Sequence, residues 1–206
     1  MYGSLFIRRL IQASKQVVEL YHVVKLDAEC KKDIMWWKRN LVKNNGVTWF
    51  PRLFDVSTAT IMFTDASQKA AAAVVGSSWT VQHFDGQFSW LADKNIAVKE
   101  LYAIILGIST FAVRLQGKQV LMNTDNKAID CCIDKGSSKD TLINALLRSL
   151  YYYTSVYHIE YKSCHVSGVS NVLADALSRD KYDVFMSAMP YADLRMTRPC
   201  RVLTDF

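Results

Sequence analysis

The sequence has few of the residues that interrupt or cross-link a chain. Of its 206 residues, 8 are Gly and 3 are Pro. The 5 Cys are odd in number and fit neither a disulfide framework nor a metal-binding motif. Hydrophobic residues make up 50% of the chain and charged residues 21%, which excludes a disordered protein. This composition predicts a globular fold with reduced thiols in an intracellular setting, cytoplasmic or nuclear.

Long hydrophobic runs are also missing. No apolar stretch approaches the roughly 18–20 residues of a membrane span. The first 20 residues carry Arg8, Arg9, Lys15 and Glu19, which is not the pattern of a signal peptide. We therefore expect no membrane partner. The net charge of +6 favours a polyanionic partner, but charge alone does not identify it.

Hydrophobic periodicity divides the chain into three parts. Residues 1–55 predict a helical segment, with helices over 4–24 and from Asp27 to about Val42, and a boundary near Pro51. Residues 56–181 predict one α/β domain, and residues 182–206 an irregular tail. Within the domain we expect strands over 59–64, 70–76, 79–88, 118–124 and 157–165, and helices over 96–115, 126–134, 140–153 and 170–179.

Two aspartates follow predicted strands. Asp65 comes directly after the apolar run that ends at Thr64, and Asp125 after the one that ends at Thr124. In open α/β sheets the carboxyl ends of the strands are where ligands bind. Asp is also common at strand ends and helix caps, so either residue alone would be read as structural.

Glu100 is harder to explain structurally. Its neighbours three and four residues away on the predicted helix are Ala97, Ala103 and Ile104, a small apolar face suited to packing on a sheet. A carboxylate buried there is costly unless a charge or a metal compensates it. The pattern therefore indicates a functional role for Glu100.

Asp175 is less informative by spacing. Asn171, Asp175 and Arg179 recur every four residues, which fits a solvated helix face with a weak ion pair. Chemistry gives a reason to consider the four carboxylates together. Two Mg²⁺ ions about 3.5–4 Å apart can serve both ends of a phosphodiester displacement, and such hard cations prefer carboxylate oxygens. An acidic cluster in a basic chain is typical of a metal-dependent nuclease.

Four segments resemble the catalytic segments of the RNase H family, in the family's order: MFTDAS, IAVKELYAIILGI, VLMNTDN and HVSGVSNVLADALSR. They are most similar to the RNase H domains of retroelement reverse transcriptases. The ending SNVLADALSR resembles the gypsy-type and especially the DIRS-type version, and residues 10–50 resemble the connector of DIRS-type elements. The resemblance covers about residues 5–181.

The resemblance implies an RNase H-like fold, with a mixed five-stranded sheet, helices on both faces and two preceding helices. It implies an endonuclease that cuts the RNA strand of RNA–DNA hybrids with two Mg²⁺ ions, for which Mn²⁺ can substitute. Asp65 would bridge both ions, Glu100 and Asp125 would complete the site facing the leaving group, and Asp175 would hold the ion that activates water. The expected partners are the hybrid and a reverse transcriptase polymerase domain, whose signature the chain lacks.

The chain departs from the family at two points. Only residues 135–139 link the two helices where many cellular members carry a basic protrusion. The loop before the last helix, Gly168-Val169-Ser170, holds no histidine, and His165 falls at the end of the preceding strand. We therefore expect a helper in product release to be missing, and we interpret the histidines as structural or surface residues.

Basic residues near the four acidic positions are candidates for phosphate contacts, because such residues dominate binding that is independent of sequence. They are Lys69, Lys94, Lys99, Lys127 and Arg179. The alternative function is an inactive nucleic-acid-binding or connector module on the same fold, as in a truncated retroelement relic. The intact carboxylate set favours the active enzyme.

Overall fold

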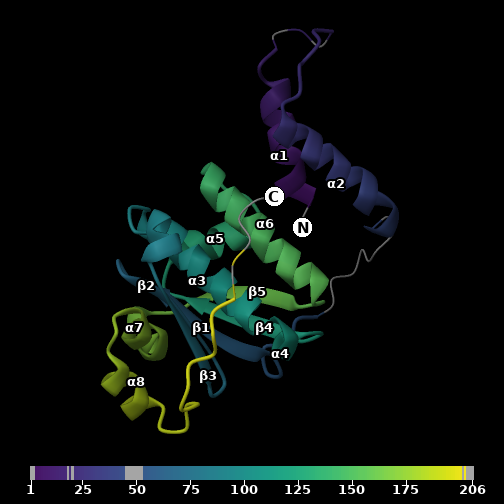
Figure 1. Cartoon of the computed structure of the whole chain (residues 1–206). Coiled ribbons are helices and arrows are strands. Elements are labelled where there is room, and N and C mark those ends of the chain that lie inside the picture. Colours follow the sequence, from purple (N-terminus) through teal and green to yellow (C-terminus); the bar gives the residue numbers. More distant parts are fainter. Residues whose placement is uncertain (1–2, 18, 20, 45–52, 201, 203–206) are drawn as a thin grey trace. The chain divides into compact units, whose positions relative to one another are not determined.

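The computed structural model describes residues 3–17, 19, 21–44, 53–200 and 202 (Figure 1). The chain divides into two compact units between Leu53 and Phe54. Each unit is built by different contacts, so each is considered by itself.

The first unit is a pair of packed helices, α1 (Gly3–Ser14) and α2 (Ala28–Asn44). Phe6 stacks on Trp36 with ring centroids 3.9 Å apart. The Asp27 carboxylate accepts a hydrogen bond from Cys30 N (2.7 Å), which begins α2 as the sequence predicts. The prediction of a helix as far as residue 24 is wrong. α1 ends at Ser14, whose hydroxyl donates to Ile11 O (2.8 Å) and competes with continuation of the helix. The predicted boundary near Pro51 lies outside the described residues.

The second unit is built on one mixed sheet of five strands, in the order β3-β2-β1-β4-β5. β2 pairs antiparallel with both β1 and β3, and β4 pairs parallel with both β1 and β5. This confirms the predicted mixed five-stranded sheet. Because β1, β4 and β5 are parallel, their carboxyl ends lie at the same end of the sheet. The strands are β1 (Thr60–Ala66), β2 (Ala70–Val75), β3 (Ser78–His83), β4 (Gln119–Thr124) and β5 (Glu160–His165).

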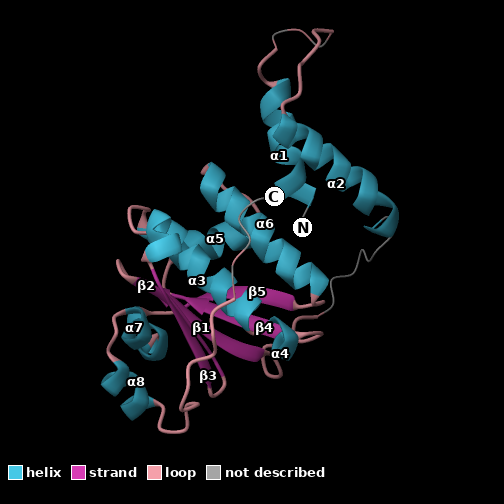
Figure 2. Cartoon of the chain, viewed as in Figure 1, coloured by secondary structure: helices cyan, strands magenta, loops and turns pink. Residues whose placement is uncertain are grey.

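Helices cover both faces of this sheet, as predicted (Figure 2). On one face, α3 approaches so closely that a Cβ at Gly107 would lie 2.8 Å from the Ala73 Cβ. On the other face, Ala72 and Val74 pack in one core cluster with Leu177 of α7. The alternation of side chains along β2 therefore serves both layers. The helices of this unit are α3 (Ile96–Thr110), α4 (Ala112–Leu115), α5 (Lys127–Lys135), α6 (Thr141–Val156), α7 (Val172–Ser178) and α8 (Tyr182–Ala188).

Three predicted elements are shorter than expected. The helix over 96–115 is divided at Phe111, whose ψ of 13° lies outside the helical range. The strand over 79–88 ends at His83 and is followed by a 3₁₀ helix, η1 (Gly86–Leu91). The strand over 157–165 begins only at Glu160, because His158 has a φ of 52°, which no β-strand accommodates.

The expectation of an irregular tail from residue 182 is wrong for its first part. α8 packs on the sheet through Phe185, which is fully buried and lies 5.5 Å from the Trp79 ring. After α8 the chain follows the edge strand β3, where Asp193 N donates to Ser77 O and Thr197 N to Trp79 O, both at 2.9 Å. These bonds cover a strand edge that would otherwise be open to pairing with another chain. Within the described ranges, no helix is long and apolar enough to cross a membrane.

The docking of α8 leads to a first prediction. Phe185→Ala should lower the free energy of unfolding by about 3–5 kcal/mol, because it leaves a cavity against Trp79. Val184→Ala is the matched control, since Val184 is 48% exposed on the same helix and its loss should cost about 0.5 kcal/mol or less. Urea unfolding followed by circular dichroism measures both. Equal losses would contradict the docking of α8.

Candidate active site

Three of the four predicted carboxylates converge at the carboxyl end of the sheet. Asp65 is the penultimate residue of β1, and Asp125 directly follows β4. Phe63 pairs with Asn123 in the parallel register, so the chain two residues later brings Asp65 level with Asp125. Glu100 reaches them from α3. One carboxylate oxygen from each of Asp65, Glu100 and Asp125 lies within 4.8 Å of the other two.

Two of these carboxylates are buried. Asp65 is 2% exposed and Glu100 3%, while Asp125 is partly exposed. Glu100 Oε1 accepts a hydrogen bond from Ala66 N (3.3 Å), and Oε2 accepts one from the Thr124 hydroxyl (3.5 Å). These neutral donors satisfy hydrogen bonding but do not neutralise the charge.

Burial and mutual repulsion make the cluster hard to ionise. Burial raises the pKa of Glu100 to about 9, and the charges of Asp65 and Asp125 add to the effect. Burial also raises the pKa of Asp65 to about 6, against a lowering by the hydroxyl of Ser178. The site therefore favours a bound positive charge, which would remove both the repulsion and the penalty for ionisation.

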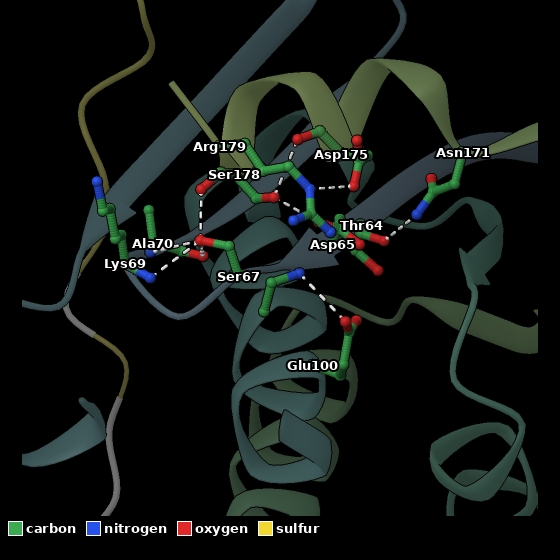
Figure 3. A network of polar contacts seen from close by, with 11 residues as sticks. Thr64, Asp65, Ser67, Lys69, Ala70, Glu100, Asn171, Asp175, Ser178 and Arg179 are labelled. Atoms are coloured by element: carbon green, nitrogen blue, oxygen red, sulfur yellow. Dashed lines mark hydrogen bonds and ion pairs between the residues drawn. The ribbon is translucent and has the colours of Figure 1, made fainter. Parts of the chain in front are cut away.

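Asp175 lies at the edge of this cluster and outside the three converging oxygens. Its Oδ1 accepts a hydrogen bond from Arg179 Nε at 2.6 Å, and its side chain is 37% exposed (Figure 3). Its charge still raises the pKa of Asp65, because α7 packs against β1. The ion pair expected from spacing therefore forms, and Asp175 lies near enough to Asp65 to affect its pKa.

The carboxylates open into a cleft of about 500 Å³. Two basic residues, Lys127 and Arg179, line it together with Asp65, Glu100 and Asp125. Lys127 is the first residue of α5, which the Asn126 side chain caps by accepting hydrogen bonds from Ala128 N and Ile129 N. The cleft thus combines three carboxylates with two cationic side chains that are suited to binding phosphates.

The other predicted phosphate contacts differ among themselves. Lys69 and Lys94 are exposed but do not line the cleft. The structure corrects the predicted phosphate contact of Lys99, because this side chain is fully buried. Its Nζ donates to Gln68 Oε1 and Ala92 O, each at 2.8 Å, and so joins two loops at the cleft instead of meeting a phosphate.

His165, which the sequence interpretation set aside, lies beside the site. It ends β5 opposite Thr124, and its exposed imidazole Nε2 lies 3.1 Å from Asp125 O. The following 3₁₀ helix, η2 (Gly168–Ser170), also approaches the site, since a Cβ at Gly168 would lie 3.6 Å from Asp125 Oδ2. The sequence did contain a signal for this position. His165 ends the predicted strand over 157–165, just as Thr124, the residue before Asp125, ends the strand over 118–124.

Comparison with known proteins relates the chain to a viral polyprotein and to a solved ribonuclease structure. No protein-family model matches the chain. The "Enzymatic polyprotein" of Figwort mosaic virus (strain DxS) is 29% identical over 194 residues, which cover 85% of this chain but only 28% of the polyprotein's length. The structure of RNase H1 from the halophilic archaeon Halobacterium salinarum NRC-1 matches 61% of this chain and 97% of that one, with 12% identity and a TM-score of 0.44. Neither similarity by itself assigns an activity to this chain.

The raised pKa of Glu100 leads to a second prediction. In the absence of divalent cations, Glu100→Gln should raise the melting temperature at pH 7–8. The folded protein keeps a proton on Glu100 up to about pH 9, whereas the unfolded chain releases it near 4.5, so the stability of the wild type falls as pH rises through this window. Gln has no charge to bury.

The measurement is thermal unfolding in EDTA at several pH values. The gain from Glu100→Gln should increase between about pH 4.5 and about 9. Glu160→Gln, at a partly exposed position in β5, is the control. A gain that is independent of pH would contradict the raised pKa of Glu100.

Proposed function

We propose that this chain is an RNase H-type endonuclease that hydrolyses the RNA strand of RNA–DNA hybrids, as part of a retroelement polyprotein or derived from one. The observation that carries the proposal is the convergence of Asp65, Glu100 and Asp125 at the end of a mixed sheet, with oxygens within 4.8 Å of one another. The four sequence segments that resemble the RNase H family, and the similarity to a viral enzymatic polyprotein, support it. DIRS-type and gypsy-type elements are the proposed origin on the sequence resemblance alone.

The residues present fit a divalent metal site. Asp65, Glu100 and Asp125 offer carboxylate oxygens, the ligands that Mg²⁺ and Mn²⁺ prefer. Burial and the neighbouring carboxylates raise the pKa values of Asp65 and Glu100, and a bound cation would offset both causes. Asp175 is close enough to act as a fourth acidic group. Divalent ions held there would supply an activated water and stabilise the leaving oxygen in phosphodiester hydrolysis.

The remaining residues of the cleft bind and orient the substrate. Lys127 and Arg179 line the same cleft as the carboxylates, which supports the proposal that they contact phosphates of the substrate. Arg179 also restrains Asp175 through their ion pair.

The decisive test of the function is cleavage of a labelled RNA–DNA hybrid in Mg²⁺ and in Mn²⁺. We expect the RNA strand to be cut and double-stranded RNA of the same sequence to remain intact. Asp125→Asn should lower the rate at least 100-fold, on the order expected when charge stabilisation is lost. Asp183→Asn, at an exposed position on α8, should cut like the wild type. A folded wild type that binds hybrid but never cuts it would identify the inactive binding module instead.

The basic rim of the cleft leads to a fourth prediction. Lys127→Ala should weaken hybrid binding and reduce the slope of log K against log salt by about 1, because one phosphate contact is lost. Lys118→Ala is the control, since Lys118 is exposed just before β4, at the opposite end of the strand from Asp125. Binding measured by fluorescence anisotropy at several salt concentrations gives both slopes. An unchanged slope for Lys127→Ala would exclude this residue from the interface.

A further inference from the structure

The end of α7 is attached to β1 directly at the acidic cluster. Ser178, the last residue of α7, is fully buried and donates its hydroxyl to Asp65 Oδ2 (Figure 3). Its backbone carbonyl accepts a hydrogen bond from the Ser67 hydroxyl at 2.6 Å. Ser67 Oγ in turn accepts hydrogen bonds from Lys69 N and Ala70 N, so it is fixed by the turn between β1 and β2.

The beginning of α7 is attached to the same strand. Asn171, which is 1% exposed, donates its amide Nδ2 to Thr64 O at 2.8 Å. Asn171 is therefore bonded to Thr64, and Ser178 is bonded to the next residue, Asp65. Asp175 lies between these two attachments on a helix of seven residues, so its distance from Asp65 depends on both.

The hydroxyl of Ser178 has a specific consequence for Asp65. The terminal torsion of an aspartate is broad, so a carboxylate at a strand end is not oriented by its own rotamer. A donor on Oδ2 fixes the plane of the carboxylate and thereby the direction of its lone pairs. In metal sites, hydrogen bonds of this kind to a ligand determine how well the ligand binds the ion.

We propose that Ser178 is a positioning residue, which orients the Asp65 carboxylate for a divalent cation while it fixes α7 and Asp175 beside the site. This inference rests on the metal-binding part of the proposed function. It assigns to Ser178 a role that differs from that of an ordinary buried helix serine, whose hydroxyl bonds only to its own helix.

Ser109 provides the matched control. It is also a buried serine, 6% exposed, on α3, the helix that carries Glu100. Its hydroxyl donates to Leu106 O within that helix (3.1 Å) and to no carboxylate. The Ser178 hydroxyl also lies 3.1 Å from a carbonyl of its own helix, Asp175 O, so both serines have a contact of this kind. Only the loss of the Ser178 hydroxyl also leaves Asp65 without its donor.

The experiment is titration of the whole chain with Mn²⁺, with free Mn²⁺ measured by electron paramagnetic resonance. Ser178→Ala should bind Mn²⁺ about 10- to 100-fold more weakly than the wild type, the range for loss of a hydrogen bond to a metal ligand. Ser109→Ala should bind like the wild type. Ser178→Thr keeps the hydroxyl and should restore most of the affinity. Circular dichroism and thermal melting establish that each variant is folded before it is titrated.

The outcomes separate this inference from the nuclease activity. Wild-type affinity in Ser178→Ala, or an equal loss in Ser109→Ala, would overturn the positioning role while leaving the nuclease proposal in place. A wild type that binds Mn²⁺ with the predicted dependence on Ser178 but cuts no hybrid would overturn the nuclease proposal alone. A wild type that binds no Mn²⁺ would overturn both.

Discussion

The burial of two carboxylates at the end of one sheet is the constraint on which the site depends. Asp65 and Glu100 are almost inaccessible, and their oxygens lie near each other and near Asp125. Desolvation and repulsion together raise both pKa values. A protein that needed only stability would place apolar side chains here. The arrangement is explained if the cost of burying charge is recovered when a divalent cation binds.

Close packing on both faces of the sheet brings the acidic groups together. Gly107 allows α3 to approach the sheet, since a Cβ there would lie 2.7 Å from the Met62 Sδ. This approach places Glu100 against the end of β1 from one side. From the other side, α7 brings Asp175 and the Ser178 hydroxyl to Asp65. The site therefore forms where two helical layers meet one strand, and a shift of either layer would separate its groups.

The C-terminal segment belongs to this architecture. Phe185 of α8 and Leu177 of α7 share one core cluster with Trp79 of the edge strand. The hydrogen bonds of Asp193 and Thr197 extend the attachment along β3. The segment after α7 thus packs against the helix that carries Asp175 and attaches it to the edge strand β3.

The sequence by itself predicted the five strands, most of the helices and four acidic residues that we considered as one group, whereas the tertiary structure showed which three of them converge. Apolar runs and the acidic residues near their ends, Asp65 and Asp125, are local signals, and local signals are readable in one dimension. Only the tertiary structure decided that Lys99 turns inward, that His165 lies beside Asp125 and that Ser178 binds Asp65. These outcomes depend on contacts between residues far apart in the chain and on the direction of each side chain, which spacing along the sequence does not encode.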